Sequence, residues 1–258
     1  MLLTIDIGNT NTEYGVYRGE EFLGSFRLTT KSGATADELG LLISQYFERF
    51  AIDGGALRGA VICSVVPQVN QTVQAALKRY LGADCLLVDR DIDPGLSYGG
   101  LITNERLGAD RAVACVAAMA KYGAPLIVLD FGTATTVDAV SRSGVYRGGC
   151  ISAGLQVTMD ALAAKAAMLP NVELTKPEHT LNFTAVGHIQ AGVVGGYVGA
   201  TEYLIRHARA ELGEEGVQVV ATGGLAHLVA RHTREIDIVD DRLILDGLRL
   251  LYERRGGR

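Results

Sequence analysis

Apolar residues near the start of the chain form two short runs that flank a polar turn. Residues 2–5 and 12–17 carry these runs, and the turn at residues 8–11 predicts that they form a β-hairpin. A capping box at residues 35–38 then precedes apolar side chains at helical spacing over residues 39–50. This pattern predicts a buried amphipathic helix packed against the hairpin.

Alternating strands and helices fill the rest of the chain. The apolar runs predict strands, and amphipathic spacing between them predicts helices. We expect strands at residues 60–66, 85–88, 125–130 and 217–221, and helices at residues 69–80, 109–121, 155–168, 188–211, 225–234 and 242–254. The order is typical of an α/β fold.

The second half of the chain repeats the layout of the first. Residues 126–140 contain an apolar strand, Asp, one apolar residue, Gly, a hydroxyl-rich turn and a second strand, as do residues 2–17. Two copies indicate a duplicated fold, although a chance recurrence of a common hairpin pattern is the alternative. We therefore expect two α/β lobes, residues 1–115 and 116–258, with a nucleotide cleft between them.

Composition narrows the function classes. A chain of 258 residues with 48% apolar content is long enough to bury a sizeable core. Its net charge of −5 and the lack of any basic run argue against binding to nucleic acid or to an anionic membrane surface. We find no leader and no apolar run of about 18 residues, and we expect a cytoplasmic protein with reduced cysteines.

The turn of the first hairpin has the composition of a phosphate-binding loop. Glycine lets backbone amides approach phosphate oxygens, Asn and Thr add neutral donors, and a preceding Asp can hold Mg²⁺ through water. The residues are Asp6, Ile7, Gly8, Asn9, Thr10, Asn11 and Thr12. The alternative is that these polar side chains only satisfy the turn.

The second half offers two further candidate loops. Asp130, Gly132 and Thr133 repeat the residue types of the first loop. Two such loops facing one cleft are a more specific sign of nucleotide binding than one loop. Gly223 and Gly224 follow a strand and precede a helix, an arrangement that can take a nucleoside against its backbone. Strand–glycine–helix junctions are also frequent in α/β proteins without any ligand.

A fourth element, Gly108, Ala109, Asp110 and Arg111, precedes an alanine-rich helix. Its carboxylate can accept the proton of a substrate hydroxyl that attacks a γ-phosphoryl group. The adjacent guanidinium can bind a substrate carboxylate at the positive end of the helix. The alternative is an ordinary helix-terminal Asp beside a solvated Arg.

Taken together in their order, these motifs resemble the type III pantothenate kinases over nearly the whole chain. The resemblance also includes Ser64-Val65-Val66-Pro67, Gly148-Gly149 with Gly154-Leu155, residues 173–177 and residues 195–199. It implies two ribonuclease-H-like lobes of the actin and sugar-kinase superfamily. It also implies an ATP-dependent kinase that phosphorylates pantothenate in coenzyme A biosynthesis.

The resemblance assigns roles to individual residues. Asp110 is expected as the catalytic base and Arg111 as the ligand of the pantothenate carboxylate. Asp130 is expected to bind a monovalent cation, K⁺ or NH₄⁺, while the Asp6 loop and Thr133 hold ATP with Mg²⁺. The family is typically dimeric, and the small-residue helix around residues 189–203 is the expected contact in a homodimer.

The acceptor pocket departs from the family pattern. The segment before Gly108 is shorter than usual, and Tyr98 is the candidate for the tyrosine that lines the pocket. Thr184 is the candidate for a threonine that contacts substrate, although the alignment places Ala185 at that position. Two further readings follow: a kinase acting on another small hydroxyl substrate, or a nucleotide-binding regulator without catalysis.

Overall fold

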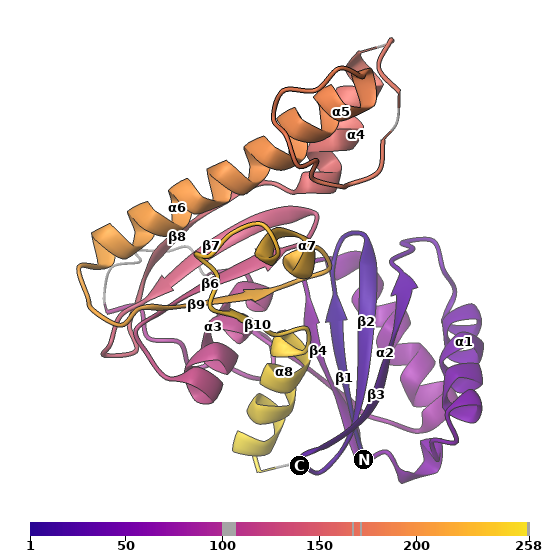
Figure 1. Cartoon of the computed structure of the whole chain (residues 1–258). Coiled ribbons are helices and arrows are strands. Elements are labelled where there is room, and N and C mark those ends of the chain that lie inside the picture. The colour runs from indigo at the N-terminus through magenta and orange to yellow at the C-terminus, as the bar shows by residue number, and fades with distance from the viewer. Residues whose placement is uncertain (100–106, 167, 171, 257–258) are drawn as a thin grey trace. The chain divides into compact units, whose positions relative to one another are not determined.

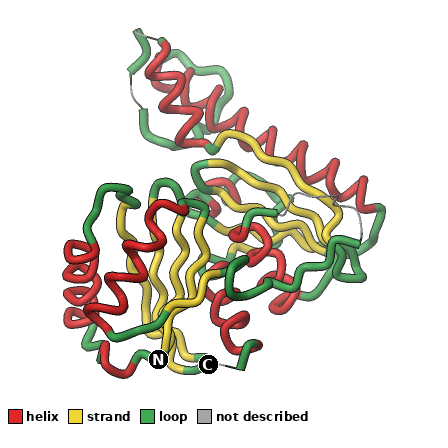
Figure 2. Tube along the Cα trace, turned by 180° about the vertical axis from the view of Figure 1, so that it is seen from behind, coloured by secondary structure: helices red, strands yellow, loops and turns green. Residues whose placement is uncertain are grey.

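The computed structural model describes residues 1–99, 107–166, 168–170 and 172–256, which form two compact units. The first unit comprises Met1–Gly95, the residues from 107 to Ala117 and those from Leu243 onward. The second runs from Ala118 to Arg242 and includes residues 96–99. Each unit contains one five-stranded sheet with helices, and the predicted α/β fold is confirmed (Figures 1 and 2). The division at residues 115 and 116 stays a prediction, and the last helix is grouped with the first unit.

The sheet of the first unit has the strand order β3-β2-β1-β4-β5. An antiparallel meander is formed by β1 (Leu2–Ile7), β2 (Asn11–Arg18) and β3 (Glu21–Thr29). On the other side of β1, β4 (Gly59–Ser64) and β5 (Cys85–Leu87) continue the sheet as parallel strands. Because β1, β4 and β5 are parallel, their carboxyl ends meet at one edge, where α/β proteins bind ligands.

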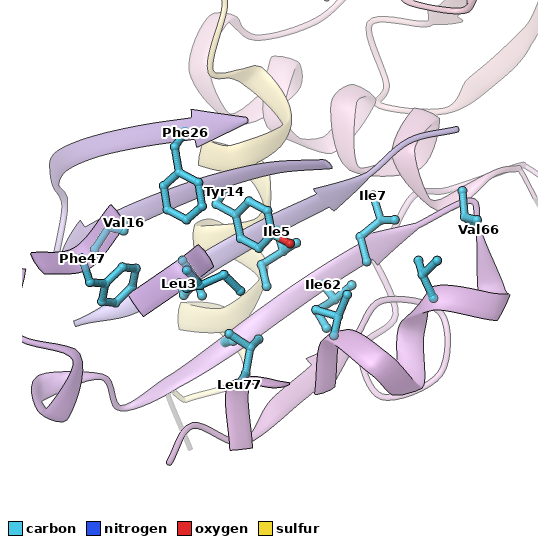
Figure 3. Close-up of a cluster of buried hydrophobic side chains, with 14 residues drawn as sticks. Leu3, Ile5, Ile7, Tyr14, Val16, Phe26, Phe47, Ile62, Val66 and Leu77 are labelled. Atoms are coloured by element: carbon cyan, nitrogen blue, oxygen red, sulfur yellow. The ribbon is translucent and has the colours of Figure 1, made fainter. Parts of the chain in front are cut away.

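Helices cover both faces of this sheet. Alternate residues of β1 point to opposite faces, so Leu3, Ile5 and Ile7 enter one core (Figure 3). Helices α1 (Ala36–Arg49) and α2 (Pro67–Leu81) contribute to that core. The other face packs against α8 (Leu243–Arg254), and a short 3₁₀ turn, η1 (Gly54–Ala56), precedes β4.

Helix α1 begins where the sequence predicts. The Thr35 hydroxyl accepts from the Glu38 amide at 3.2 Å, and the Glu38 carboxylate accepts from the Thr35 amide at 2.8 Å. Helix α2 has Pro67 at its start and ends at Gly82, whose φ of 64° only glycine adopts readily. The capping chemistry therefore fixes the ends of both helices.

The second unit repeats the topology of the first with the order β10-β9-β6-β7-β8. Strands β6 (Leu126–Phe131), β7 (Ala134–Val140) and β8 (Tyr146–Ala153) form the antiparallel meander. Strands β9 (Gln218–Thr222) and β10 (Ile238–Val239) extend it in parallel from β6. Each of the five strands thus has a counterpart in the first unit, and the predicted duplication is confirmed.

The helices of the second unit differ from those of the first in length and position. Helix α6 (Gly196–Leu212) packs on β6 and β7. Near the N-terminal end of α6, α4 (Leu155–Lys165) and α5 (Ala185–Gln190) meet in a smaller apolar cluster (Figure 1). Helix α7 (Ala226–Ala230) follows β9. Helix α3 (Ala109–Tyr122) begins in the first unit and ends in the second.

Several predicted bounds are wrong. The helix expected over residues 188–211 consists of α5, a π-helical segment at Ala191–Gly195 and α6. The helix expected over residues 225–234 is the short α7. Strands β3, β8 and β10 were not expected, and β8 contains Gly148 and Gly149, which weaken the strand pattern. Within the part of the chain that the structure describes, no helix is both long and apolar enough to cross a membrane.

Candidate active site

The predicted phosphate loop of the first unit is the tight turn between β1 and β2. Its amide and carbonyl ends close on each other, because the Gly8 amide donates to the Asn11 carbonyl at 3.0 Å. The side chains of Asn9, Thr10 and Asn11 are exposed, whereas Thr12 is buried. The tip of the turn therefore presents polar side chains to solvent, while the hydrogen bond between Gly8 and Asn11 and the burial of Thr12 fix its ends.

Thr30, at the end of β3, supports this loop from behind. Its hydroxyl donates to the Gly8 carbonyl at 2.7 Å, and its amide donates to the Thr10 carbonyl at 2.9 Å. The Thr12 hydroxyl lies 2.9 Å from the Thr30 hydroxyl, and since the latter donates to Gly8, it accepts from Thr12. Sequence reasoning missed Thr30, whose only signal was a hydroxyl at the end of an unrecognised strand.

Three carboxylates of the first unit lie within electrostatic reach of one buried thiol. Burial raises the pKa of Cys63 well above its usual value, and the charges of Asp6, Asp110 and Asp89 raise it further. Asp6 pairs with Cys63 in the parallel ladder of β1 and β4. The structure thus brings the predicted residues Asp6 and Asp110 to one region of the first unit.

Asp89 is a member of this carboxylate group that sequence reasoning did not select. It lies two residues after β5, and Asp6 is the second-last residue of β1, so its place at the carboxyl end of a parallel strand was the available signal. Its backbone has a φ of 68°, a left-handed conformation that is uncommon outside glycine. Asp89 is therefore a further candidate for the site.

Asp110 and Arg111 lie in the first turn of α3, where the sequence places them. The Arg111 amide donates to the Asp110 carboxylate at 2.8 Å, which turns one carboxylate oxygen toward the helix N-terminus. A Cβ at Gly108 would lie 2.8 Å from the same oxygen, so a larger residue at this position would displace the Asp110 carboxylate. The element presents a carboxylate and a guanidinium side by side.

The second predicted loop joins β6 and β7. The Gly132 amide donates to the Ala134 carbonyl at 3.1 Å, and the Gly154 amide donates to the Thr133 carbonyl at 3.0 Å. A Cβ at Gly154 would lie 2.3 Å from the Gly132 carbonyl oxygen, so the start of α4 packs directly on the loop. Asp130 is the second-last residue of β6, as Asp6 is of β1 in the first unit.

The third predicted loop lies against the second. Gly223 has a φ of 92°, and a Cβ there would be 2.3 Å from the Asp130 carboxylate and 2.7 Å from the Phe131 amide nitrogen. The Leu225 amide donates to the Phe131 carbonyl at 3.3 Å. Asp130, the Gly132–Thr133 turn and the Gly223–Gly224 turn are thus brought together in the second unit.

Tyr197 of α6 contacts the strand that leaves the second loop. Its hydroxyl makes a short hydrogen bond with the hydroxyl of Thr135, which is buried. Burial raises the pKa of Tyr197, hydrogen bonds with Thr135 and the Leu155 backbone oppose that rise, and the charge of Asp130 adds to it. Sequence reasoning assigned no role to Tyr197.

The two residues predicted for the acceptor pocket have structural partners. The ring of Tyr98 meets that of Tyr146 at 5.8 Å between centroids. Thr184 precedes α5, and its hydroxyl accepts from the Gly187 amide at 3.1 Å as a helix cap. The sequence also predicts that the segment at residues 99–104 is shorter than in the family. Residues 100–104 of this segment lie outside the described residues.

The carboxylates of the first unit suit a Mg²⁺ ion that is bound partly through water. Over the described residues no group of three His, Cys, Asp or Glu side chains lies close enough to bind a metal ion directly. The negative charges of Asp6, Asp89 and Asp110 nevertheless all act on Cys63, whose pKa each of them raises. Mg²⁺ typically keeps several waters and takes one or two carboxylates, so a water-mediated site suits this arrangement.

Comparison with known proteins assigns the family. The model of the family described as type III pantothenate kinase matches residues 2–207. The type III pantothenate kinase of Roseiflexus castenholzii is 44% identical over 253 residues, 98% of each chain. That of Myxococcus xanthus is 42% identical over 255 residues, 98% of each chain.

A solved structure shares the fold at lower sequence similarity. The inorganic polyphosphate/ATP-glucomannokinase of Arthrobacter sp. strain KM superposes with a TM-score of 0.50 at 16% identity, covering 98% of each chain. This likeness supports the two-lobe sugar-kinase fold alone. The sequence relatives carry the assignment, and the chain belongs to the type III pantothenate kinase family.

Proposed function

We propose that the protein transfers the γ-phosphoryl group of ATP to the primary hydroxyl of pantothenate. The product is 4′-phosphopantothenate, and the reaction is the first step of coenzyme A biosynthesis. The observation that carries the proposal is the match to type III pantothenate kinases along nearly the entire chain. As a member of this family, the chain is an ATP-dependent kinase.

Asp110 is the proposed catalytic base, since it is a carboxylate in the first turn of α3 whose oxygen accepts from the Arg111 amide. Phosphoryl transfer needs a positioned acceptor for the hydroxyl proton more than a strong base. Arg111 binds the pantothenate carboxylate through its planar guanidinium. Gly108 and Ala109 allow close approach of the substrate to the backbone, and Tyr98 and Thr184 complete the proposed acceptor pocket.

Three loops are proposed to bind ATP. Residues 6–12 and the turns at Gly132–Thr133 and Gly223–Gly224 supply backbone amides and hydroxyl groups for the nucleotide. Asp6 is proposed to hold Mg²⁺ through water, and Asp130 is proposed to bind K⁺ or NH₄⁺. Bound cations neutralise charge on the phosphates during transfer.

We also propose a cytoplasmic homodimer. Large apolar side chains are exposed in the segment around α4, α5 and α6, where Leu181 is 87% and Tyr203 55% exposed. Apolar side chains this exposed would lose their contact with water in a subunit interface. The proposed contact includes the helix around residues 189–203.

Release of ADP by the purified protein tests the proposed reaction. With Mg-ATP and K⁺, a coupled assay should show turnover that depends on pantothenate. Asp110→Asn should fold normally, with an unchanged thermal midpoint, but lose at least a hundred-fold in kcat because the hydroxyl proton has no acceptor. Full activity of Asp110→Asn would disprove its role as the base.

One observation favours a second acceptor class. The Thr184 hydroxyl is already engaged in capping α5, so its proposed contact with substrate requires an additional hydrogen bond. ATP binding without pantothenate-dependent turnover would favour another small hydroxyl substrate, and a panel of hydroxy acids and sugars would identify it. ATP binding with no turnover on any acceptor would indicate a regulator.

A further inference from the structure

A cavity of about 700 Å³ lies in the first unit, next to the first phosphate loop, whose last residue, Thr12, is part of its lining. The hairpin of β2 and β3 forms one wall, and helices α1 and α2 form the others. Small-molecule sites in proteins typically have volumes of about 300–1,000 Å³. The size therefore suits a compact organic ligand.

The lining of the cavity is chiefly aliphatic. Its apolar walls are made by Leu28, Leu39, Leu42, Val69 and Val73. Leu42 is 44% exposed and the neighbouring Leu41, which also lines the cavity, is 54% exposed. An aliphatic body placed here would remove apolar surface from water on both partners, which is the main favourable term in such binding.

One cation lies at the rim of this cavity. The ammonium group of Lys31 has no hydrogen bond or ion pair among the residues that the structure describes. The nearby carboxylate of Glu38 is held chiefly by the Thr35 amide and hydroxyl, and Lys31 contributes least to lowering its pKa. The positive charge of Lys31 is therefore available to an anionic head group.

Two threonines that line the cavity also support the first phosphate loop. Thr12 and Thr30 both line the cavity, and their hydroxyls are 2.9 Å apart. Thr30 in turn holds the Gly8 carbonyl at 2.7 Å. A ligand that packs on these threonines restricts the hydrogen-bonded chain that fixes the loop.

We propose that this cavity binds a small aliphatic carboxylate, with the chain on the leucine and valine walls and the head group at Lys31. Occupation orders Thr12 and Thr30 and so tightens binding of ATP at the adjoining loop. The binding site stands on the cavity alone, whereas the effect on ATP rests on the proposed function. By linkage, ATP must tighten carboxylate binding by the same factor.

Titration calorimetry with octanoate and octan-1-ol tests the site on the full-length protein. Octanoate should bind more tightly than the alcohol, and Lys31→Met should remove that difference. Thr72→Phe, which places a ring in the cavity from α2, should weaken both ligands at least ten-fold. Octanoate that fails to bind, or that binds Thr72→Phe unchanged, overturns the proposal.

Two control variants separate the site from general effects. Gln71→Phe adds the same ring at the adjacent exposed position of α2, and Lys165→Met removes an exposed cation in the second unit. Both should bind octanoate like the parent protein. A loss in either control equal to the loss in its partner variant would show nonspecific binding and overturn the proposal.

The coupling to ATP is measured separately. Saturating octanoate should lower the Kd of ATP at least two-fold in the parent protein and leave it unchanged in Thr72→Phe. An unchanged Kd in the parent overturns the coupling. Failure of the protein to bind ATP at all overturns the proposed function and the coupling together, while the octanoate titration still decides the cavity site.

Discussion

Gly223 lies where a side chain has no room. It combines a φ of 92° with a virtual Cβ 2.3 Å from the Asp130 carboxylate. Gly223→Ala should destabilise the fold by about 2 kcal/mol or more, since strain and overpacking add. It should also weaken any cation held by Asp130. Urea unfolding measures the first effect, and the K⁺ dependence of ADP release measures the second.

Gly216 supplies the matched control for this substitution. Its φ of 68° is also positive, but nothing lies within 4 Å of its virtual Cβ. Gly216→Ala should therefore cost only the left-handed backbone penalty of about 1 kcal/mol, with no effect on K⁺ dependence. Equal losses for the two variants would contradict the importance of the contact with Asp130.

Asp240 should contribute a pH-dependent part of the stability of the second unit. Burial alone would raise its pKa, but hydrogen bonds from Lys121 and Tyr122 outweigh burial and leave the pKa below its ordinary value. The stabilisation is therefore full above the unfolded pKa of about 3.9 and is lost as pH falls through the folded value.

Asp240→Asn measures this contribution. The free energy of unfolding of the variant should fall below that of the parent at pH 7, and the two should converge in acid. Chemical unfolding at several pH values between 7 and 3 gives the difference directly. A difference that stays constant down to pH 3 would show that ionisation of Asp240 plays no part.

At the scale of elements, Gly40 sets the approach of α1 to α2. A Cβ at Gly40 would lie 2.2 Å from the ring of Tyr80, on the facing helix. Alanine is the better helix former by about 1 kcal/mol, yet overpacking typically costs about 1–3 kcal/mol. Gly40→Ala should therefore destabilise the protein on balance, as followed by urea unfolding.

The same helix provides a comparison one turn further on. The Ser44 side chain makes no hydrogen bond among the described residues, and Ser44→Ala should be neutral or slightly stabilising through helix propensity. If Gly40→Ala proves as stable as Ser44→Ala, the two helices have room to separate and the close packing is not limiting.

Sequence patterns predicted elements wherever local chemistry specified them. Thr35 and Glu38 mark the start of α1 because their side chains bond to each other's backbone amides. Strand β8 was missed since its glycines lack the side chains that define a strand pattern. The π-helical segment at Ala191–Gly195 left no sequence signal beyond its glycines, and backbone hydrogen bonding decides between α and π forms.

The candidate site shows the same limit. Asp6 was selected from the sequence because glycine and hydroxyl residues follow it, and Asp110 because it begins an alanine-rich helix beside Arg111. Thr30 and Tyr197 were not, because they reach the loops from strands and helices far along the chain. Residue pairs of high sequence separation are fixed by tertiary packing, which local pattern does not encode.

At the scale of the whole molecule, the two units anchor their loops through equivalent threonines. Thr12 is paired with Ile7 in β1, and Thr135 is paired with Phe131 in β6, so both occupy the same place in the duplicated hairpin. Both are buried, at 5% and 2% exposure. Their partners differ: Thr30 directly follows the neighbouring strand β3, and Tyr197 lies in α6.

This difference predicts unequal effects of the same substitution. Thr12→Val should cost about 0.5–1.5 kcal/mol, because Thr30 keeps its bond to the Gly8 carbonyl. Thr135→Val should cost more, about 1–3 kcal/mol, because it leaves the half-buried Tyr197 hydroxyl without that partner. Urea unfolding and ATP titration of the two variants give both quantities.

Tyr197→Phe completes the comparison. If the hydroxyl pair anchors the second loop, the double variant Thr135→Val with Tyr197→Phe should be more stable than the sum of the single losses predicts, since both polar groups are then absent. Strict additivity would show that the two hydroxyls act independently. In that case the duplicated threonines would share a position in the fold without sharing a role in holding the loops.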